Sequence, residues 1–264
     1  IYTILPNNVS HSIISINLET CEEKVICNIA DLEVYELTFH LNGNIFAIGY
    51  EKNTQSIYLF EIEEMTCNIV NSYPLPPYYN EINFLPWIGL CCGKDGNIYI
   101  GTNIFIKFDY QTKEFTKLGE FNFPFRFVHD MSLVNGEIVM CVSNYIQPIE
   151  YSIVVNLESI EDSKISASTY CGINQFNNCQ SSDVFFIDNF GLNKFSTVDS
   201  LPSLICPLNS IYDWKGLASK LEFLLPLRTL DLGADVSICR AESHHIVIPT
   251  IAGDQIRWQD GNTS

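Results

Sequence analysis

The side chains that could perform acid/base chemistry are few and scattered. A histidine and an aspartate are adjacent at His129-Asp130, and Glu36 and Asp213 are further candidates. Neighbouring residues on a strand point to opposite faces, so His129 and Asp130 cannot act together there. We therefore expect these side chains to be polar groups at strand ends rather than catalytic groups.

Motifs for other chemistries are missing. The chain contains no Gly-x-Ser-x-Gly elbow and no Asp-x-Asp-x-Asp-Gly calcium loop. Asp95-Gly96-Asn97 is typical of a turn, and His244-His245 has no third ligand nearby in the sequence. The sequence thus predicts no catalytic, cofactor-binding or metal-binding residues.

The chain has ten cysteines, none of them in the CxxC spacing of a zinc site. They favour an oxidising, extracellular compartment, with one local disulfide between Cys21 and Cys27 and another between Cys171 and Cys179. The pairing of five others stays open: Cys91, Cys92, Cys141, Cys206 and Cys239. Cysteines in strand-like runs can instead be small apolar core residues, and these are Cys67, Cys92 and Cys141.

The elements that must position these residues are strands. Apolar residues alternate in short runs such as 57–62, 98–100, 104–108 and 153–157. Hairpin turns are predicted at Asn42-Gly43, Asp95-Gly96 and Asn135-Gly136. A repeat of about 40 to 50 residues is typical of the four-stranded blades of a β-propeller.

The two ends of this repeat region complement each other. Trp214-Lys215-Gly216-Leu217 begins a blade that lacks later strands, whereas residues 1–29 supply strands without a first one. We therefore predict an all-β, five-bladed propeller over residues 1–226, closed by joining its N- and C-terminal strands. Six blades are the alternative if Tyr73–Pro86 hides strands, although its prolines favour a loop.

Composition excludes two classes of partner. Of the 264 residues, 17% are charged, and the net charge is −17. A nucleic-acid-binding protein needs clustered Lys and Arg, so this charge argues against nucleic acid. No apolar stretch has the length that spans a bilayer, so we expect no membrane insertion.

Residues 227–264 are predicted to be a linker and the first strands of an immunoglobulin-like module. This segment resembles the opening of PKD-type repeats in large secreted Bacteroidetes proteins. The matching residues are Gly233, Asp235, Cys239, Glu242, Trp258, Asp260, Gly261 and Ser264. The first 226 residues are similar to the N-terminal propeller regions of the same proteins at Gly89-Leu90, 95–99 and 108–113, where Lys113 replaces the usual Gly. The resemblance implies export by type IX secretion to the cell surface or an extracellular appendage.

Aromatic side chains are the remaining candidates for a contact surface. They are Tyr73, Tyr78, Tyr79, Trp87 and Trp214, the tyrosines lying in a proline-stiffened segment. The sequence favours a non-enzymatic adhesion or appendage-forming head that binds a protein or glycan on another cell, or copies of itself as a homo-oligomer. The alternative is a secreted polysaccharide-acting propeller enzyme, with Asp130 and Asp213 facing each other about 5 to 10 Å apart across the channel.

Overall fold

The structure is a computed structural model, and almost all of its regular structure is β-strand. It describes residues 2–6, 10–30, 32–77, 88–122, 127–134, 136–143, 150–166, 173–177, 183–188, 191–196, 202–207 and 215–218. Within these ranges the strands form five four-stranded antiparallel sheets. A short 3-10 helix, η2 (Ile160–Asp162), precedes the last strand of one of them.

Each sheet is a meander of strands that are consecutive in the sequence, apart from one strand of the first sheet. The N-terminal sheet has the order β20 (Lys215–Ala218), β1 (Tyr2–Pro6), β2 (Ser10–Ile16) and β3 (Glu23–Ala30). The second sheet contains β4 (Leu32–Phe39), β5 (Ile45–Glu51), β6 (Ser56–Ile62) and β7 (Ile69–Pro74). The third contains β8 (Gly89–Cys92), β9 (Ile98–Gly101), β10 (Ile104–Asp109) and β11 (Glu114–Glu120). The fourth contains β12 (Phe127–Val134), β13 (Glu137–Ser143), β14 (Glu150–Val154) and β15 (Lys164–Ser166). The fifth contains β16 (Ile173–Asn177), β17 (Asp183–Asp188), β18 (Gly191–Ser196) and β19 (Pro202–Pro207).

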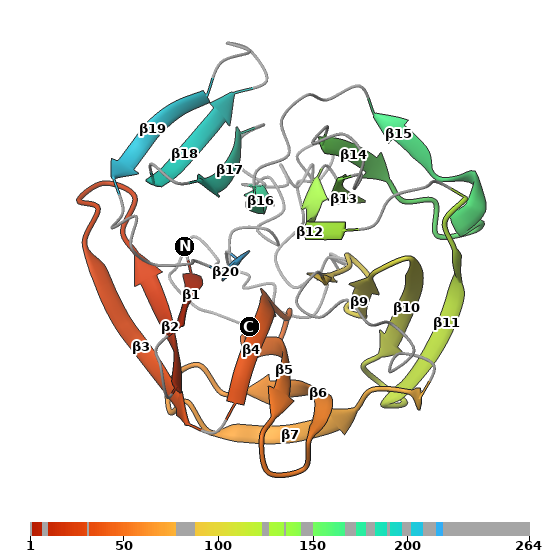
Figure 1. Cartoon of the computed structure of the whole chain (residues 1–264), viewed down its shortest axis with the longest axis horizontal. Coiled ribbons are helices and arrows are strands. Elements are labelled where there is room, and N and C mark those ends of the chain that lie inside the picture. Colours follow the sequence, from red (N-terminus) through yellow and green to blue (C-terminus); the bar gives the residue numbers. More distant parts are fainter. Residues whose placement is uncertain are drawn as a thin grey trace, which may run out of the picture.

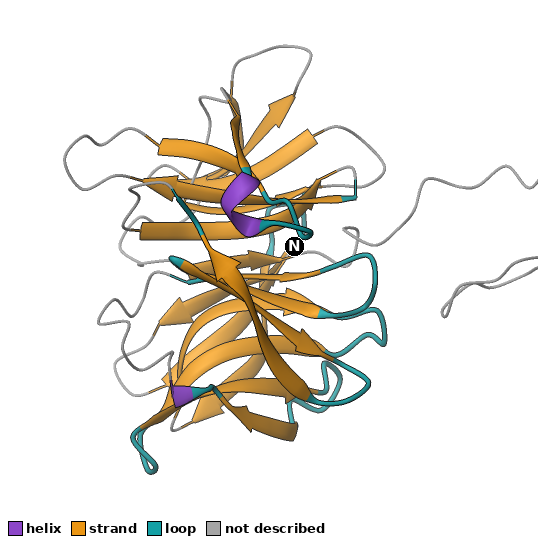
Figure 2. Cartoon of the chain, turned by 90° about the vertical axis from the view of Figure 1, so that its right-hand side faces the viewer, coloured by secondary structure: helices purple, strands orange, loops and turns teal. Residues whose placement is uncertain are grey.

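The sheets are arranged around a common centre as in a β-propeller (Figure 1). The first strand of each sheet lies innermost and contacts its neighbours in the order β20, β4, β8, β12, β16 and back to β20. The long strands β3, β7 and β11 run along the periphery. Figure 2 shows the ring from the side, with most of the described turns gathered on one face.

Three predicted hairpin turns join the first and second strands of their sheets. Gly43, Gly96 and Gly136 have φ values of 91°, 77° and 81°, which a residue with a side chain rarely adopts. The Asn-Gly and Asp-Gly signals in the sequence are thus explained by the backbone conformation that these turns require.

The two ends of the described chain meet in the N-terminal sheet, as the sequence predicted. Strand β20 pairs with β1 through Tyr2 and Ala218, Thr3 and Leu217, and Ile4 and Lys215. This pairing is short and contains one register shift, whereas β1 pairs with β2 over its full length. Trp214, the first residue of the sequence pattern that predicts this closure, lies outside the described residues.

The apolar core lies in the seams between sheets. One cluster joins the second and third sheets through residues such as Phe46, Leu59, Leu90 and Phe108. Similar clusters fill the seams of the N-terminal sheet with the second and fifth sheets, and the seam between the third and fourth sheets. Side-chain packing between sheets therefore holds the ring together.

Candidate functional site

Glu36 and Asp130 occupy equivalent places on the innermost strands of the second and fourth sheets. Each follows a bulge, at Tyr35 in β4 and at His129 in β12. Each residue is 1% exposed, and its carboxylate accepts a hydrogen bond from the backbone N–H of the next residue, Leu37 at 3.0 Å and Met131 at 2.6 Å. Both groups therefore stabilise the local backbone of their strand.

Several candidates from the sequence cannot be placed by the described part of the chain. These are Tyr78, Tyr79, Trp87, Cys171, Cys179, Asp213, Trp214, Cys239, His244 and His245, together with the whole segment 227–264. Among the residues that the structure does describe, no group of three or more His, Cys, Asp or Glu side chains could hold a metal ion.

The predicted disulfide between Cys21 and Cys27 is wrong, because both cysteines bond to other partners. Cys21 is linked to Cys206 with the Cα atoms 5.3 Å apart, and Cys27 is linked to Cys67 with the Cα atoms 5.4 Å apart. Across the β2–β3 pair Cys27 faces Ile13, whereas Cys21 lies in the turn beyond the last pair. Cys67 is likewise a disulfide cysteine in a turn rather than a core residue.

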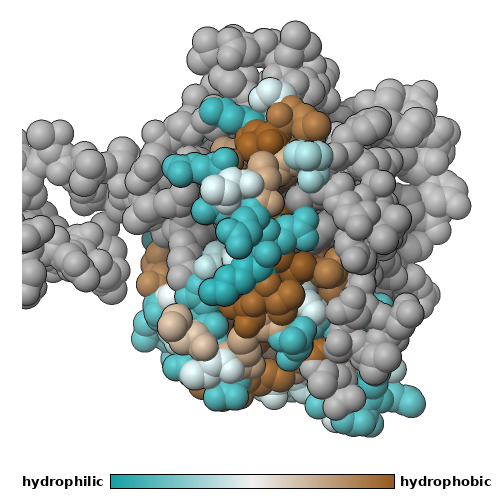
Figure 3. All heavy atoms as spheres, turned by 90° about the vertical axis from the view of Figure 1, so that its left-hand side faces the viewer, coloured by the Kyte–Doolittle hydropathy of each residue, from teal (hydrophilic) through white to brown (hydrophobic). Residues whose placement is uncertain are grey.

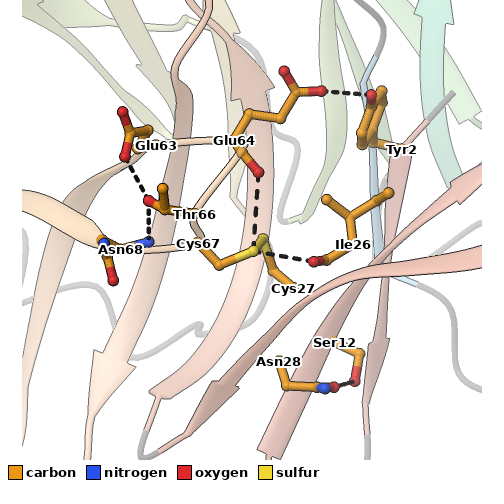
Figure 4. The surroundings of a disulfide bond; sticks show 10 residues. All are labelled: Tyr2, Ser12, Ile26, Cys27, Asn28, Glu63, Glu64, Thr66, Cys67 and Asn68. Carbon is orange, nitrogen blue, oxygen red and sulfur yellow. Dashed lines mark hydrogen bonds between the residues drawn. A yellow bond between two sulfur atoms is a disulfide. The ribbon is translucent and has the colours of Figure 1, made fainter.

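Both disulfides fasten the N-terminal sheet to a neighbouring sheet. Cys21–Cys206 reaches β19 of the fifth sheet, and Cys27–Cys67 joins β3 to the β6–β7 turn of the second sheet (Figure 4). Beside the latter bond, the Tyr2 hydroxyl donates to Glu64 Oε1 at 2.6 Å. We call the contact of the N-terminal and second sheets the disulfide seam.

Of the other described cysteines, Cys91, Cys92 and Cys141 are buried thiols, as expected for Cys92 and Cys141.

A repeated turn explains where two of these cysteines lie. Cys21, Cys67 and Lys113 each donate the backbone N–H to the carbonyl four residues earlier, with φ values of 58°, 61° and 63°. A threonine precedes each of them: Thr20, Thr66 and Thr112. The repeated Thr-Cys pair was a sequence signal for equivalent disulfides in neighbouring seams.

Tyr73 belongs to β7 rather than to the predicted loop, and its side chain packs inward. Its ring lies 4.6 Å from that of Phe108, and its hydroxyl donates to Glu61 Oε2 at 3.2 Å. Burial, followed by the charge of Glu61, raises the pKa of Tyr73 to about 12. The structure therefore places Tyr73 in β7, half-buried against the third sheet, instead of in the predicted loop. We call the contact of the second and third sheets the tyrosine seam.

Glu61 is the centre of the tyrosine seam and is 2% exposed. Its Oε1 atom accepts hydrogen bonds from Asn44, Tyr110 and Asn42 at 2.8, 3.1 and 3.3 Å. Asn71 donates to Oε2 at 2.8 Å. Burial alone would raise the pKa of Glu61, but these hydrogen bonds outweigh it and lower the pKa.

Lys113 completes this cluster from the third sheet. Its ammonium nitrogen lies 3.3 Å from the centre of the Tyr110 ring and 5.9 Å from that of Tyr73. Burial lowers the pKa of Lys113, although the charge of Glu61 opposes the change. The polar groups of the tyrosine seam thus contact one another through hydrogen bonds and a cation–π contact.

A cavity of about 520 Å³ lies in the next seam, between the third and fourth sheets. We call this contact the cavity seam. Its buried lining is apolar and comes from Tyr99, Leu133, Ile138 and Val155. Charged side chains surround the opening: Lys94, Asp95, Glu137, Glu158, Asp162 and Lys164. A volume of this size is typical of sites that bind a small molecule or a few side chains.

The outer surface also exposes apolar side chains. On the side formed by β2, β3 and β19, apolar side chains lie between hydrophilic ones (Figure 3). Val25 of β3 and Leu204 of β19 are each 51% exposed. Single exposed apolar residues are common on soluble proteins, so they do not by themselves mark a site.

The comparisons with known proteins find similarity in structure only. No protein-family model and no curated protein sequence matches the chain. A chain of a nidogen/laminin complex is 8% identical, with a TM-score of 0.48, over 82% of this chain and 97% of that one. TolB from Acinetobacter baumannii is 10% identical, with a TM-score of 0.46, over 79% of this chain and 53% of TolB, about half its length. A protein of unknown function from Bacteroides caccae is 10% identical, with a TM-score of 0.43, over 80% of this chain and 73% of that one.

The disulfides indicate that the chain folds in an oxidising environment, which favours an extracellular location. None of the helical segments described is both long and apolar enough to cross a membrane.

Proposed function

We propose that the chain is a non-enzymatic, extracellular binding head that serves attachment between cells or the assembly of an appendage. The observation that carries this proposal is the pair of disulfides that ties the N-terminal sheet to both neighbours. Such bonds persist outside the reducing cytosol and keep a small binding module folded there. The resemblance to type IX-secreted surface proteins, with a PKD-type module over 227–264, points the same way.

Five blades are part of this proposal. The five described sheets and the unbroken order of contacts among their innermost strands support a complete five-bladed ring over six blades. A ring of this kind packs each sheet between two neighbours and presents its seams and turns for binding.

A binding role also fits the places of the carboxylates better than catalysis does. Glu36 and Asp130 each hold a backbone N–H within their own strand. The alternative, a polysaccharide-acting enzyme, requires Asp130 to face Asp213 across the channel. Asp213 lies outside the described residues.

Location and binding are tested together. We expect protease-treated intact cells to release peptides that are linked through Cys21–Cys206 and Cys27–Cys67. Beads coated with the oxidised chain should adhere to cells or to one another, whereas beads coated with reduced and alkylated chain should not. Free thiols at all four positions in the cellular protein, or equal retention of both kinds of bead, would contradict the proposal.

A further inference from the structure

The tyrosine seam and the cavity seam are built from equivalent positions. Phe108 of β10 pairs with Ile98, and in the next sheet the N–H of Val155 donates to the carbonyl of Ile138. Ile98 and Ile138 face the first strands of their sheets at Cys92 and Leu133. Tyr110 is the second residue after Phe108, and Leu157 is the second residue after Val155. Tyr110 and Leu157 are therefore counterparts.

Tyr110 fills the tyrosine seam on the face that carries the first turns. Its ring lies 5.9 Å from that of Phe46, nearly perpendicular to it, and 4.0 Å from the His40 ring. Asn42 donates to its hydroxyl oxygen at 2.9 Å, and the hydroxyl donates to Glu61. One aromatic ring with a polar end thus closes the space between two sheets.

The cavity seam has smaller side chains at the corresponding places. Leu157 is 42% exposed, and Gly93 stands where the second sheet has His40. A Cβ atom on Gly93 would lie 2.6 Å from both Asp95 Oδ1 and a ring carbon of Tyr99, so no larger residue fits. Asp95 and the Tyr99 ring thus occupy the place of the His40 side chain, and the cavity includes the room that the Tyr110 ring takes up one seam earlier.

The remaining lining would suit an inserted ring. Tyr99 stands in the place of Phe46, and Asp95 stands in the place of Asn42. Asp95 Oδ2 already accepts from Tyr99 and Asn97 at 2.9 and 2.7 Å, but a carboxylate has further acceptor sites for a hydroxyl or an indole N–H.

From this equivalence we infer that the cavity is a docking site for a tyrosine or tryptophan side chain of a partner protein. The ring packs against Tyr99 and Leu157, and its polar end donates to Asp95. Tyrosine and tryptophan are also the side chains that most often anchor protein interfaces. The inference rests on the proposed binding function and gives that function a partner chemistry.

The charge around the cavity favours particular residues next to the docked side chain in the partner. Four carboxylates and two ammonium groups surround the opening, and the whole chain carries a net charge of −17. A partner segment with basic residues beside the aromatic one is therefore attracted, and an acidic segment is repelled.

Capped tripeptides test the site on the oxidised chain by isothermal titration or NMR. We expect lysine–tyrosine–lysine to bind at least tenfold more tightly than lysine–alanine–lysine or glutamate–tyrosine–glutamate. Lysine–phenylalanine–lysine should fall between them, because it fills the cavity without the hydrogen bond to Asp95. Equal affinities of the tyrosine and alanine peptides would overturn the inference.

The variant Leu157→Tyr installs the residue of the tyrosine seam in the cavity. It should weaken the lysine–tyrosine–lysine peptide at least tenfold and raise the melting temperature by about 2 to 4 °C, because its ring fills the empty space. The matched control is Met65→Tyr, at a turn residue that is 87% exposed, which should change neither quantity. An unchanged affinity in Leu157→Tyr would place the peptide elsewhere and overturn the inference.

The two proposals can fail separately. Failure of the peptides to bind would leave the disulfide mapping and the bead adhesion of the binding head unaffected. Conversely, free thiols in the cellular protein would contradict the extracellular head while leaving the peptide result as it stands.

Discussion

On one side of the second sheet Cys67 is bonded to Cys27 of the N-terminal sheet, and on its other side Lys113 lies over the ring of Tyr110. Cys67 and Lys113 occupy the same kind of turn with the same backbone hydrogen bond. Tyr73 lies six residues after Cys67, just as Cys27 lies six residues after Cys21, so Tyr73 and Cys27 are equivalent. The disulfide seam and the tyrosine seam thus use equivalent positions for a covalent and a non-covalent contact.

The disulfide seam and the tyrosine seam differ because the chain connects their sheets differently. The second and third sheets are each one continuous meander, so their seam is supported by local chain connections. The N-terminal sheet is completed by β20 from the other end of the described chain, and β20 pairs with β1 through only three residue pairs, with one register shift. Both disulfides lie at this sheet, where covalent bonds limit the opening that the pairing alone permits.

The largest expected effect is the loss of the disulfides. Cys21–Cys206 closes a separation of 185 residues and Cys27–Cys67 one of 40 residues, so their removal by serine pairs should cost about 5 and about 4 kcal/mol. Removing both disulfides should cost less than the two values added, because the loop closed by Cys21–Cys206 contains the loop closed by Cys27–Cys67. Urea unfolding with and without reductant measures the free energy. The free energy of unfolding of the variant that lacks both disulfides should not change with reductant. If that of the wild type does not change either, the prediction is refuted.

The tyrosine seam should respond to a single substitution. Glu61→Gln places an amide N–H₂ among donors that now bind a carboxylate, which should lower the free energy of unfolding by about 2 to 3 kcal/mol. Glu114→Gln, at an exposed carboxylate, is the control and should stay within about 0.5 kcal/mol of wild type in the same urea series. A similar small loss in both variants would mean that Glu61 does not hold the seam.

The pH dependence separates the two seams further. The pKa of Glu61 is lowered from an ordinary value of 4.5, so its contribution to stability is present above that value and is lost as pH falls through the folded pKa. Wild type should therefore lose more stability than Glu61→Gln when pH is reduced from about 6 to about 3. Denaturant midpoints across this range measure the effect. The disulfides do not titrate there, so parallel curves for the two proteins would contradict the role of Glu61.

Strands, turns and the pairing of β20 with β1 could be predicted because each leaves a local pattern. Asp95-Gly96 required a positive φ, and alternating apolar residues such as 104–108 required a two-sided strand. The pairing of Cys21 with Cys206 left no such pattern, since it depends on which sheets become neighbours. Closeness in sequence predicts that Cys21 and Cys27 pair across one hairpin, but the register of β2 and β3 sets them apart.

The candidate site was beyond prediction for a similar reason. A cavity depends on the volumes of side chains from two sheets, and Leu157 shows its role only beside Tyr110 of the preceding sheet. Tyr73 was expected in a loop because prolines follow it, but the pairing of Leu59 with Tyr73 keeps it in β7. The prolines determined where the strand ends rather than whether it forms.

The smallest expected effect is the most direct test of the equivalence of the seams. The double variant Tyr73→Cys and Lys113→Cys places cysteines at the positions that Cys27 and Cys67 occupy in the disulfide seam. We expect a third disulfide under oxidising conditions, detected after proteolysis as a linked pair of peptides about 2 Da lighter than the two reduced peptides together. Its gain of about 4 kcal/mol should be largely offset by the lost packing of Tyr73 and the lost contact of Lys113 with Tyr110, leaving a net change of about 1 kcal/mol. When both proteins are reduced, the variant should be less stable than wild type, because it lacks the packing of Tyr73 and the contact of Lys113 with Tyr110. Two free thiols in the folded, oxidised variant would show that the turns of the two seams are not interchangeable.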